Sequence, residues 1–345
     1  MSSKVTEQET LSVAWAHGEL SLLLDGAMCA PVSFKLGDGN TVQPFALVPW
    51  QDEKSEEFDR LVPLLKWLRG EWVCVPFGMP ATRDDLPADW APDDLAASGI
   101  GSWFHGPGAN LGWREVGRNA GGVTLEIVYP DDHPIERLVR TITGSPHGPR
   151  LDFELSVHPR ADCKLPVGVH PVFRLPEEPG AAILSVAGDI TVNTYPVDAE
   201  VGVSKLPHNA TFRFLETARW ADGVSVDLSR HPLSAQTEEI VLVTGVSGHA
   251  ALENHHEGYR VDLRWDPSAF ESCNLWISNR GRGSYPWNNR FCGLGIEPVS
   301  APFDLGVEVA NSGSTPLHGA GHRCGVDFTA GTVWRTRYSI DVAPL

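Results

Sequence analysis

The sequence predicts an all-β protein built from large antiparallel sheets, and two observations support this prediction. Hydrophobic and polar residues alternate with a period of two in several segments, as in strands that bury one face and expose the other. Glycine and proline supply 34 and 27 of the 345 residues without a regular period, which indicates many turns. Antiparallel sheets with one face in water fit both observations.

Four segments show the alternation clearly, and each predicts a strand. In the first, Val123, Leu125 and Ile127 alternate with Thr124 and Glu126. The other three segments are residues 151–157, 261–265 and 334–342. The turn residues that separate such strands favour a sandwich of antiparallel sheets.

Other parts of the chain predict connections and little helix. Apolar residues near a spacing of 3.6 predict one helix over residues 55–68, and a short turn is expected over 93–98. Residues 80–94 form an acidic loop that contains proline, and residues 255–257 are expected in a hairpin turn.

Domain organisation is predicted to be simple. A length of 345 residues favours two domains at about 150 residues each, but β-sandwiches often exceed that size as one unit. No convincing linker and no repeat of fixed period separates two halves. We therefore expect one domain over residues 1–345, with residues 1–12 as a disordered or loosely attached N-terminus.

The charge and hydropathy of the chain exclude several classes of function. With 27 Lys and Arg against 44 Asp and Glu, the formal net charge is −17, which argues against nucleic-acid binding. No apolar run approaches the roughly 20 residues of a membrane-spanning helix. The first residues lack the basic and apolar regions of a signal peptide, so we expect a cytoplasmic protein without membrane partners.

Motifs for metals and common cofactors are weak or absent. The six cysteines include no CxxC pair, so they indicate buried thiols and no zinc site or disulfide framework. His318, His322 and Cys324 have a spacing that would suit zinc on a helix, but neighbouring glycines favour a loop. The Walker, dinucleotide-binding and GxSxG motifs are not found. We expect no metal and no cofactor.

Two residues suit acid–base chemistry. Glu297 follows a short apolar run and precedes Pro298, so we expect it to end a strand beside a rigid turn. Partial burial there raises the pKa of a carboxyl group, which suits a general base. His170 also precedes a proline and can exchange a proton near neutral pH. For either residue alone, capping a strand is the more common role.

Three segments taken together point to a known family. They are residues 101–115, with His105 and Trp113; residues 168–176, with His170, Pro171 and Phe173; and residues 291–304, with Glu297 and Pro298. In this order and spacing they resemble the aldose 1-epimerase (galactose mutarotase-like) family, as an uncharacterised branch. The similarity extends over roughly residues 20–343. It implies a β-supersandwich of large antiparallel sheets with few short helices.

The resemblance also implies an activity. Such an isomerase interconverts the α and β anomers of a sugar or sugar derivative. By similarity, Glu297 takes the proton of the anomeric hydroxyl while His170 protonates the ring oxygen, and His105 binds sugar hydroxyls or assists His170. Acid and base are both needed because neither the proton nor the C–O bond leaves readily alone. This chemistry implies no metal and no organic cofactor.

Further substrate-binding residues follow less directly. Arg83 resembles the substrate-binding arginine of the family, and Trp113 and Trp287 are candidates to stack on a sugar face, with core packing as the alternative. The binding aspartate is assigned to Asp227, with Asp222 as the other possibility. Arg174 stands where galactose enzymes have asparagine. An arginine there would favour an anionic sugar, such as a uronate or a sugar phosphate, as the substrate.

Two functions from different classes remain open. The first is the mutarotase, acting on a small-molecule sugar as a monomer or homodimer. The second is a carbohydrate-binding or sensing protein that has the same fold but no turnover. A domain of a larger glycosidase or lyase is a weaker third reading, since the chain contains no second catalytic domain.

Overall fold

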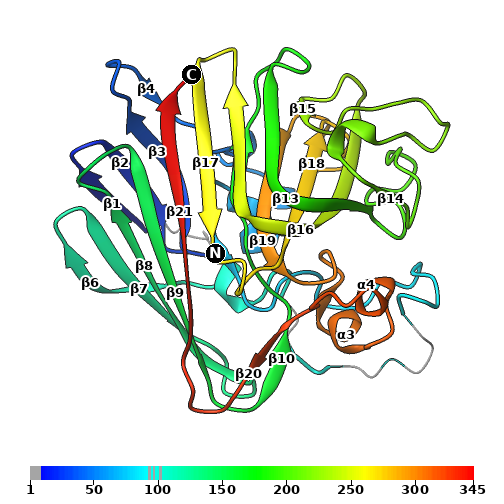
Figure 1. Ribbon diagram of the computed structural model, residues 1–345. Helices are drawn as coiled ribbons and strands as arrows, with labels where there is room; N and C mark the ends of the chain where they lie inside the picture. Colours follow the sequence, from blue (N-terminus) through cyan, green and yellow to red (C-terminus); the bar gives the residue numbers. More distant parts are fainter. Residues whose placement is uncertain (1–8, 92–94, 96–97, 101–102) are drawn as a thin grey trace.

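The computed structural model describes residues 9–91, 95, 98–100 and 103–345. Its main element is a sheet of 15 strands, whose named strand pairs are antiparallel (Figure 1). Eleven strands follow one another across this sheet, in the order β5 (Val73–Cys74), β11 (Val167–Val169), β19 (Cys292–Ser300), β18 (Ser272–Asn279), β16 (Thr237–Asn254), β17 (Tyr259–Trp265), β21 (Trp334–Pro344), β9 (Arg150–Pro159), β8 (Ile135–Gly144), β7 (Gly122–Val128) and β6 (Arg114–Asn119).

Four more strands branch from this order. β12 pairs with β19, β13 pairs with β16, and two short strands extend β13; their bounds are β12 (Val172–Arg174), β13 (Ala182–Thr194), β14 (Thr211–Phe212) and β15 (Arg230–His231). A separate two-stranded sheet joins β10 (Cys163–Leu165) to β20 (Val326–Phe328). The short helices are α1 (Glu56–Asp59), α2 (Pro63–Trp67), α3 (Gly306–Asn311) and α4 (Pro316–Gly319).

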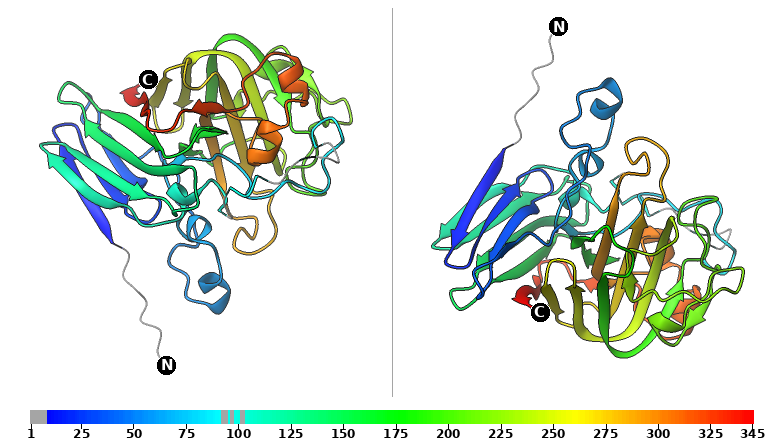
Figure 2. Two further views of the ribbon diagram at one scale, coloured as in Figure 1. Left: turned by 90° about the horizontal axis from the view of Figure 1, so that it is seen from below. Right: turned by 90° about the horizontal axis from the view of Figure 1, so that it is seen from above.

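A second sheet of four strands covers part of the first. It contains β1 (Thr10–Trp15), β2 (Gly18–Leu23), β3 (Met28–Lys35) and β4 (Thr41–Val42), and Figure 2 shows it beside β6–β9. Leu20 and Phe34 from this sheet belong to the same buried cluster as Leu125, Ile142 and Leu155 from the large sheet. The described chain is therefore a sandwich at this end, as the alternating strands predict.

The four strands predicted from alternation are confirmed. They correspond to β7, β9, β17 and β21, and the predicted turn at residues 255–257 connects β16 to β17. In β7, the apolar residues Val123, Leu125 and Ile127 are buried, as the period of two requires.

Three expectations about elements are corrected. The helix expected over 55–68 is divided into α1 and α2, because Val62 is extended (ψ 150°) before Pro63, which begins the second helix. Strand β1 begins at Thr10, so residues 10–12, which were expected in a loose terminus, belong to a strand. His318 lies on helix α4, where a loop was expected, whereas His322 and Cys324 follow the helix in a loop as expected. The turn expected over 93–98 lies mostly outside the described residues.

Glu297 is also placed differently from expectation. Strand β19 does not end there but continues through Pro298 to Ser300. The missing N–H of Pro298 is tolerated because Pro298 falls between the segments that pair with β12 and with β11. Glu297 is thus an interior strand residue and only 1% exposed.

Strands β18 and β19 and the first part of β16, residues 237–244, differ from the alternating strands because both of their faces are buried. All eight residues of β18 are buried. Cys273, Leu275 and Ile277 face the large core of the sandwich, while Trp276 faces a second core rich in aromatic residues. This second face positions the cavity described below.

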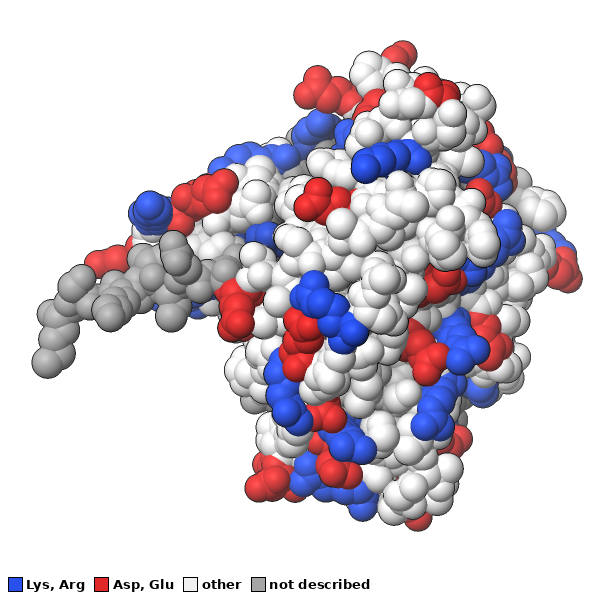
Figure 3. All heavy atoms as spheres, turned by 90° about the vertical axis from the view of Figure 1, so that its left-hand side faces the viewer, with Lys and Arg blue, Asp and Glu red and all other residues white. Residues whose placement is uncertain are grey.

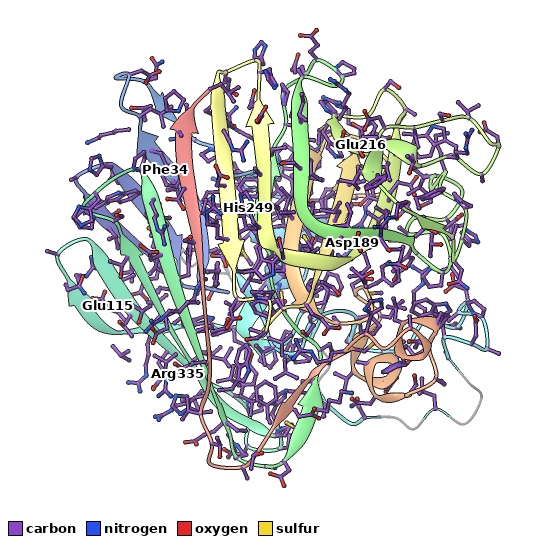
Figure 4. All side chains as sticks on the ribbon, viewed as in Figure 1. Phe34, Glu115, Asp189, Glu216, His249 and Arg335 are labelled. Carbon is purple, nitrogen blue, oxygen red and sulfur yellow. The ribbon has the colours of Figure 1, made fainter. Side chains whose placement is uncertain are left out.

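The outer surface carries charges of both signs. On the face in Figure 3, cationic and anionic side chains are interspersed. His249, labelled in Figure 4, pairs with Asp262 of the neighbouring strand at 2.7 Å, and Arg337 pairs with Glu154 in the same way at 2.7 Å. The six cysteines are free thiols. Among the described residues, no helix is long and apolar enough to cross a membrane.

Candidate active site

A cavity of about 150 Å³ opens between the large sheet and helix α2. One side consists of residues on or next to β11, β16, β18 and β19, and the other of apolar residues around α2. The residues that line it are Val62, Leu64, Leu65, Leu68, Trp72, Phe104, His105, His170, Ile240, Asn274, Trp276, Arg282, Trp287, Glu297 and Asp304. Apolar walls with a few converging polar groups are typical of small-molecule sites.

The position of Glu297 follows from strand register. Asn274 of β18 lies directly opposite Glu297 of β19, so both side chains point to the same face. The amide Nδ2 of Asn274 donates a hydrogen bond to Glu297 Oε2 at 2.7 Å. Gly295, on the same face, leaves room for the carboxylate, since a Cβ there would lie 2.3 Å from Glu297 Oε1.

His170 enters the cavity between β11 and β12. Its backbone N–H donates to the carbonyl of Trp72 at 2.8 Å, and Pro171 restricts it to an extended conformation. The imidazole stacks on the Trp72 ring with centroids 4.2 Å apart. Its Nε2 lies 3.3 Å from Glu297 Oε1, so the predicted acid and base are neighbours.

His105 completes the group of titratable side chains at this end of the cavity. It has a positive φ of 59°, which is uncommon for a residue with a Cβ and often marks a functional position. Gly78 N–H donates to His105 Nδ1 at 3.1 Å, so the neutral ring carries its proton on Nε2. The rings of His105 and His170 are 5.0 Å apart and nearly perpendicular.

Burial dominates the proton affinities of these three groups. It raises the pKa of Glu297 well above its usual value; the nearby Asp304 acts in the same direction, and the hydrogen bond from Asn274 opposes it. Burial lowers the pKa of His170 well below its usual value and that of His105 to about 3. Burial therefore favours the neutral form of all three groups.

Several buried polar atoms around the cavity lack a partner. Within the described residues, His170 Nδ1, Asn274 Oδ1 and Glu297 Oε1 are buried and make no hydrogen bond. Unsatisfied buried polar atoms are costly and therefore rare in native proteins. A ligand with several hydroxyl groups would satisfy them.

Another wall of the cavity includes Trp276 and Arg282, which the sequence prediction missed, and Glu238, which does not itself line the cavity, is their buried partner. Glu238 of β16 is fully buried and accepts hydrogen bonds from Trp276 Nε1 at 2.6 Å and Ser278 Oγ at 2.9 Å. Arg282 pairs with Glu238 (Nε to Oε1 2.9 Å), and its guanidinium lies 4.7 Å from the centre of the Trp287 ring. Two tryptophans and an ion pair thus form one packed unit.

Asp304 was also missed, although it lies in the segment that contains Glu297. It lines the cavity and accepts a hydrogen bond from Tyr195 Oη at 2.7 Å. Burial raises its pKa, while Tyr195 and the nearby arginines lower it. Its position seven residues after Glu297, in an Ala-Pro-Phe-Asp segment, is the only sequence signal that marks it.

The structure places two predicted binding residues outside the cavity. Arg83 is not among its lining residues, because it forms a two-pronged pair with Asp85 (2.7 and 2.8 Å). Arg174 is also outside, and it pairs with Glu257 (Nη1 to Oε1 2.6 Å). Both of the arginines that suggested an anionic sugar are thus engaged elsewhere.

The remaining predicted residues divide in the same way. Trp113 lies in the large core, where its Nε1 donates to the Gly108 carbonyl at 2.8 Å, and Asp227 accepts from the Ser229 N–H at 2.9 Å. Neither lines the cavity. Trp287 does line it, with Arg282 over its ring. Trp113 is held in the core by packing, and Asp227 is held by a hydrogen bond within its loop, so neither reaches the cavity.

The one metal-like spacing in the sequence, His318 with His322 and Cys324, forms no metal-binding cluster within the described residues. Among the described residues, no group of three or more His, Cys, Asp or Glu side chains is arranged to hold a metal ion. His318 uses both ring nitrogens within the protein, Nδ1 with Thr315 Oγ1 at 2.8 Å and Nε2 with the Ala310 carbonyl at 3.2 Å.

These observations define a galactose mutarotase-like fold in which His170 and Glu297 are neighbours in a cavity, and solved structures agree on the fold. A galactose mutarotase-like protein from Clostridium acetobutylicum is 16% identical, with a TM-score of 0.61, over 99% of this chain and 96% of the other. An aldose epimerase homologue from C. elegans is 13% identical, with a TM-score of 0.61, over 98% and 100%.

A galactose mutarotase-like protein from Lactobacillus casei is 12% identical, with a TM-score of 0.55, over 97% and 100%. No model of a known protein family matches the chain, and no curated protein matches its sequence significantly. At these identities the similarity establishes the predicted fold and leaves the activity to be argued from the site.

Proposed function

We propose that this protein is a mutarotase, which interconverts the α and β anomers of an aldose or a closely related sugar. The observation that carries this proposal is the pair of His170 and Glu297, whose Nε2 and Oε1 atoms lie 3.3 Å apart in a cavity that has apolar walls and several polar side chains. Acid–base catalysis of ring opening requires a proton donor and a proton acceptor within reach of one substrate. Unpartnered polar atoms on Asn274, His170 and Glu297 add groups that would bind hydroxyls.

The proposed reaction moves one proton at each of the two oxygens, O1 and O5, of the sugar hemiacetal. Ionised Glu297 accepts the proton of the O1 hydroxyl, protonated His170 donates its proton to the ring oxygen O5, the C1–O5 bond breaks and the C1=O1 bond forms. The pair is then neutral, with the proton on Glu297. Rotation about C1–C2 and the reverse transfers close the ring on its other face. The pair holds one proton throughout, and burial of both groups favours the neutral intermediate state.

Other cavity residues are assigned to substrate binding. His105 presents Nε2–H as a donor, since its Nδ1 accepts from Gly78. Asp304 and Asn274 offer acceptors, and Trp287 with Arg282 forms the opposite wall. The histidine N–H donor and the carboxyl and amide oxygen acceptors together match the mixed donor and acceptor character of sugar hydroxyls.

The test is anomer exchange measured by NMR on a panel of aldoses. Glu297→Gln and His170→Asn remove one proton-transfer group each, so we expect each to lower the exchange rate at least about 100-fold. Circular dichroism and thermal unfolding check that the fold remains. Glu216→Gln, at an exposed position labelled in Figure 4, is the control and should retain full activity.

The same panel separates the proposal from its rival. Saturable sugar binding by calorimetry without faster exchange in the unmodified protein would replace the enzyme with a carbohydrate-binding or sensing protein. Activity that survives both Glu297→Gln and His170→Asn would overturn the assignment of the acid–base pair.

A further inference from the structure

One wall of the cavity carries a cation that the proposed chemistry does not use. Arg282 is the only arginine or lysine among the described residues that line the cavity. Its Nε is the nitrogen closest to both neighbouring carboxylates, at 2.9 Å from Glu238 and 3.9 Å from Glu200. Nε is buried and, despite this ion pair, donates no hydrogen bond within the described part of the chain, while the side chain as a whole remains 26% exposed.

The partner of this cation is built into the sheet. Glu238 is fully buried and lies beside Ser278 in the pairing of β16 with β18. Its carboxylate is held by Trp276, Ser278 and Arg282. Burial raises the pKa of Glu238, while Arg282 and the two hydrogen-bond donors oppose this and favour the ionised form. Such a pair is expensive to bury, so a role beyond stability is expected of it.

The local charge does not favour an anionic ligand. Glu297 and Asp304 also line the cavity, so two carboxyl groups and the buried Glu238 face one guanidinium. Arg282 therefore provides hydrogen-bond donors without a net positive field. The predicted partners of an anionic sugar, Arg83 and Arg174, are paired with Asp85 and Glu257 outside the cavity.

We propose that the Glu238–Arg282 pair determines substrate specificity: Arg282 donates to hydroxyls of an uncharged sugar, and Glu238 cancels the charge that would attract a uronate or a sugar phosphate. This inference rests on the proposed sugar-binding function of the same cavity. Glu238 acts through Arg282 and is a positioning residue. A bare guanidinium would instead bind a carboxylate or phosphate with two parallel hydrogen bonds.

The test compares glucose with glucuronate, and galactose with galacturonate, which differ only by a carboxylate at C6. We expect the unmodified protein to favour the uncharged member of each pair in anomer exchange by at least about tenfold. Glu238→Gln leaves the charge of Arg282 uncompensated and should shift this ratio towards the uronate by about tenfold, as expected for one charge about 10 Å away at an effective dielectric of about 20. The comparison uses exchange NMR for rates and calorimetry for affinities.

A matched control lies next to the variant. Glu239 is also buried on β16 and, like Glu238, does not line the cavity, but it accepts hydrogen bonds from the N–H groups of Lys205 (2.6 Å) and Leu206, which do not line the cavity either. Glu239→Gln removes the same charge and should leave the uronate ratio unchanged. Arg282→Gln should weaken binding of the uncharged sugar without any gain for the uronate, and it keeps the test decisive if Glu238→Gln does not fold.

The outcomes separate this inference from the proposed function. Equal or faster turnover of uronates by the unmodified protein would overturn the specificity role while the mutarotase activity stands. A ratio that shifts equally in Glu238→Gln and Glu239→Gln would also overturn it. If no sugar is exchanged, the mutarotase proposal fails, and the calorimetric affinities alone decide whether the pair selects uncharged sugars.

Discussion

The missing side chain of Gly295 leaves the space that the Glu297 carboxylate occupies. Gly295 is two residues before it on the same face of β19, and a Cβ there would lie 2.3 Å from Oε1 and 3.1 Å from Trp276 Cβ. The closest contact is with the end of the Glu297 side chain, which can move. A methyl group at residue 295 should therefore leave the fold intact but displace the Glu297 carboxylate.

Gly295→Ala should therefore reduce anomer exchange by about 100-fold, because displacement of a catalytic group by about 1 Å has effects of this size. The rate is measured by exchange NMR, and thermal unfolding should change little. Gly148→Ala, at a position with nothing within 4 Å of the added Cβ, is the control. An active Gly295→Ala protein would show that the carboxylate can adjust.

Sequence context identified some single residues and missed others for a physical reason. Glu297 and His170 stand out because each is a polar residue beside a proline within an apolar stretch. Asn274 gives no such signal, since its role depends on facing Glu297 across a strand pairing 23 residues away. Arg174 has suitable chemistry, but tertiary structure brings it to Glu257, 83 residues away, whereas the partner of Arg83, Asp85, is only two residues away in sequence.

At the scale of elements, the pairing of β18 with β19 adjusts the pKa of Glu297, the proposed base. The Asn274 amide stabilises the ionised form of Glu297 and so lowers its pKa against the effect of burial. Without this donor, Glu297 holds its proton to higher pH, and the doubly protonated, inactive form of the His170–Glu297 pair persists further up the pH range.

Asn274→Ala should therefore move the acid limb of the pH–rate profile upward by about one unit, the size expected for one hydrogen bond to a charged group. The profile of kcat is measured by exchange NMR across pH. Ser272→Ala, two residues earlier on β18, should leave the limb in place. A profile that only decreases in height would limit Asn274 to substrate binding.

The same elements explain how far the fold could be predicted. Strands β7, β9, β17 and β21 alternate because one face is exposed or half-buried, so their sequence pattern indicates them directly. Strands β16, β18 and β19 are buried on both faces over the site, which removes the alternation. The candidate site is therefore built on the strands that periodicity identifies least well.

At the scale of the whole molecule, buried histidines couple stability to pH. Burial lowers the pKa of His105 to about 3 and those of His133 and His231 to about 4, while an unfolded chain has values near 6.5. A depressed pKa contributes stability that is complete above pH 6.5 and is lost as the pH falls towards the folded value. Glu239, whose pKa burial raises to about 6, acts with the opposite sign.

From pH 7.5 to pH 5.5, each of these histidines should remove about 1.4 kcal/mol from the free energy of unfolding. Urea denaturation at the two pH values measures the loss, and both lie above the pI of about 5.1, where solubility falls. His231→Gln should reduce the difference between the two pH values by about 1.4 kcal/mol, whereas the exposed His255→Gln should not. Equal pH dependence in all three proteins would contradict this account.

Because both faces of β18 are buried, the sequence of this strand can change only in a limited way. Cys273, Leu275 and Ile277 belong to the main core, and Asn274 and Trp276 between them belong to the cavity. Inserting or deleting one residue would exchange the two sets and damage folding and ligand binding at once. New ligand preferences can therefore arise only by substitution at every second position, so only a few residues of each strand can change without damage to the core.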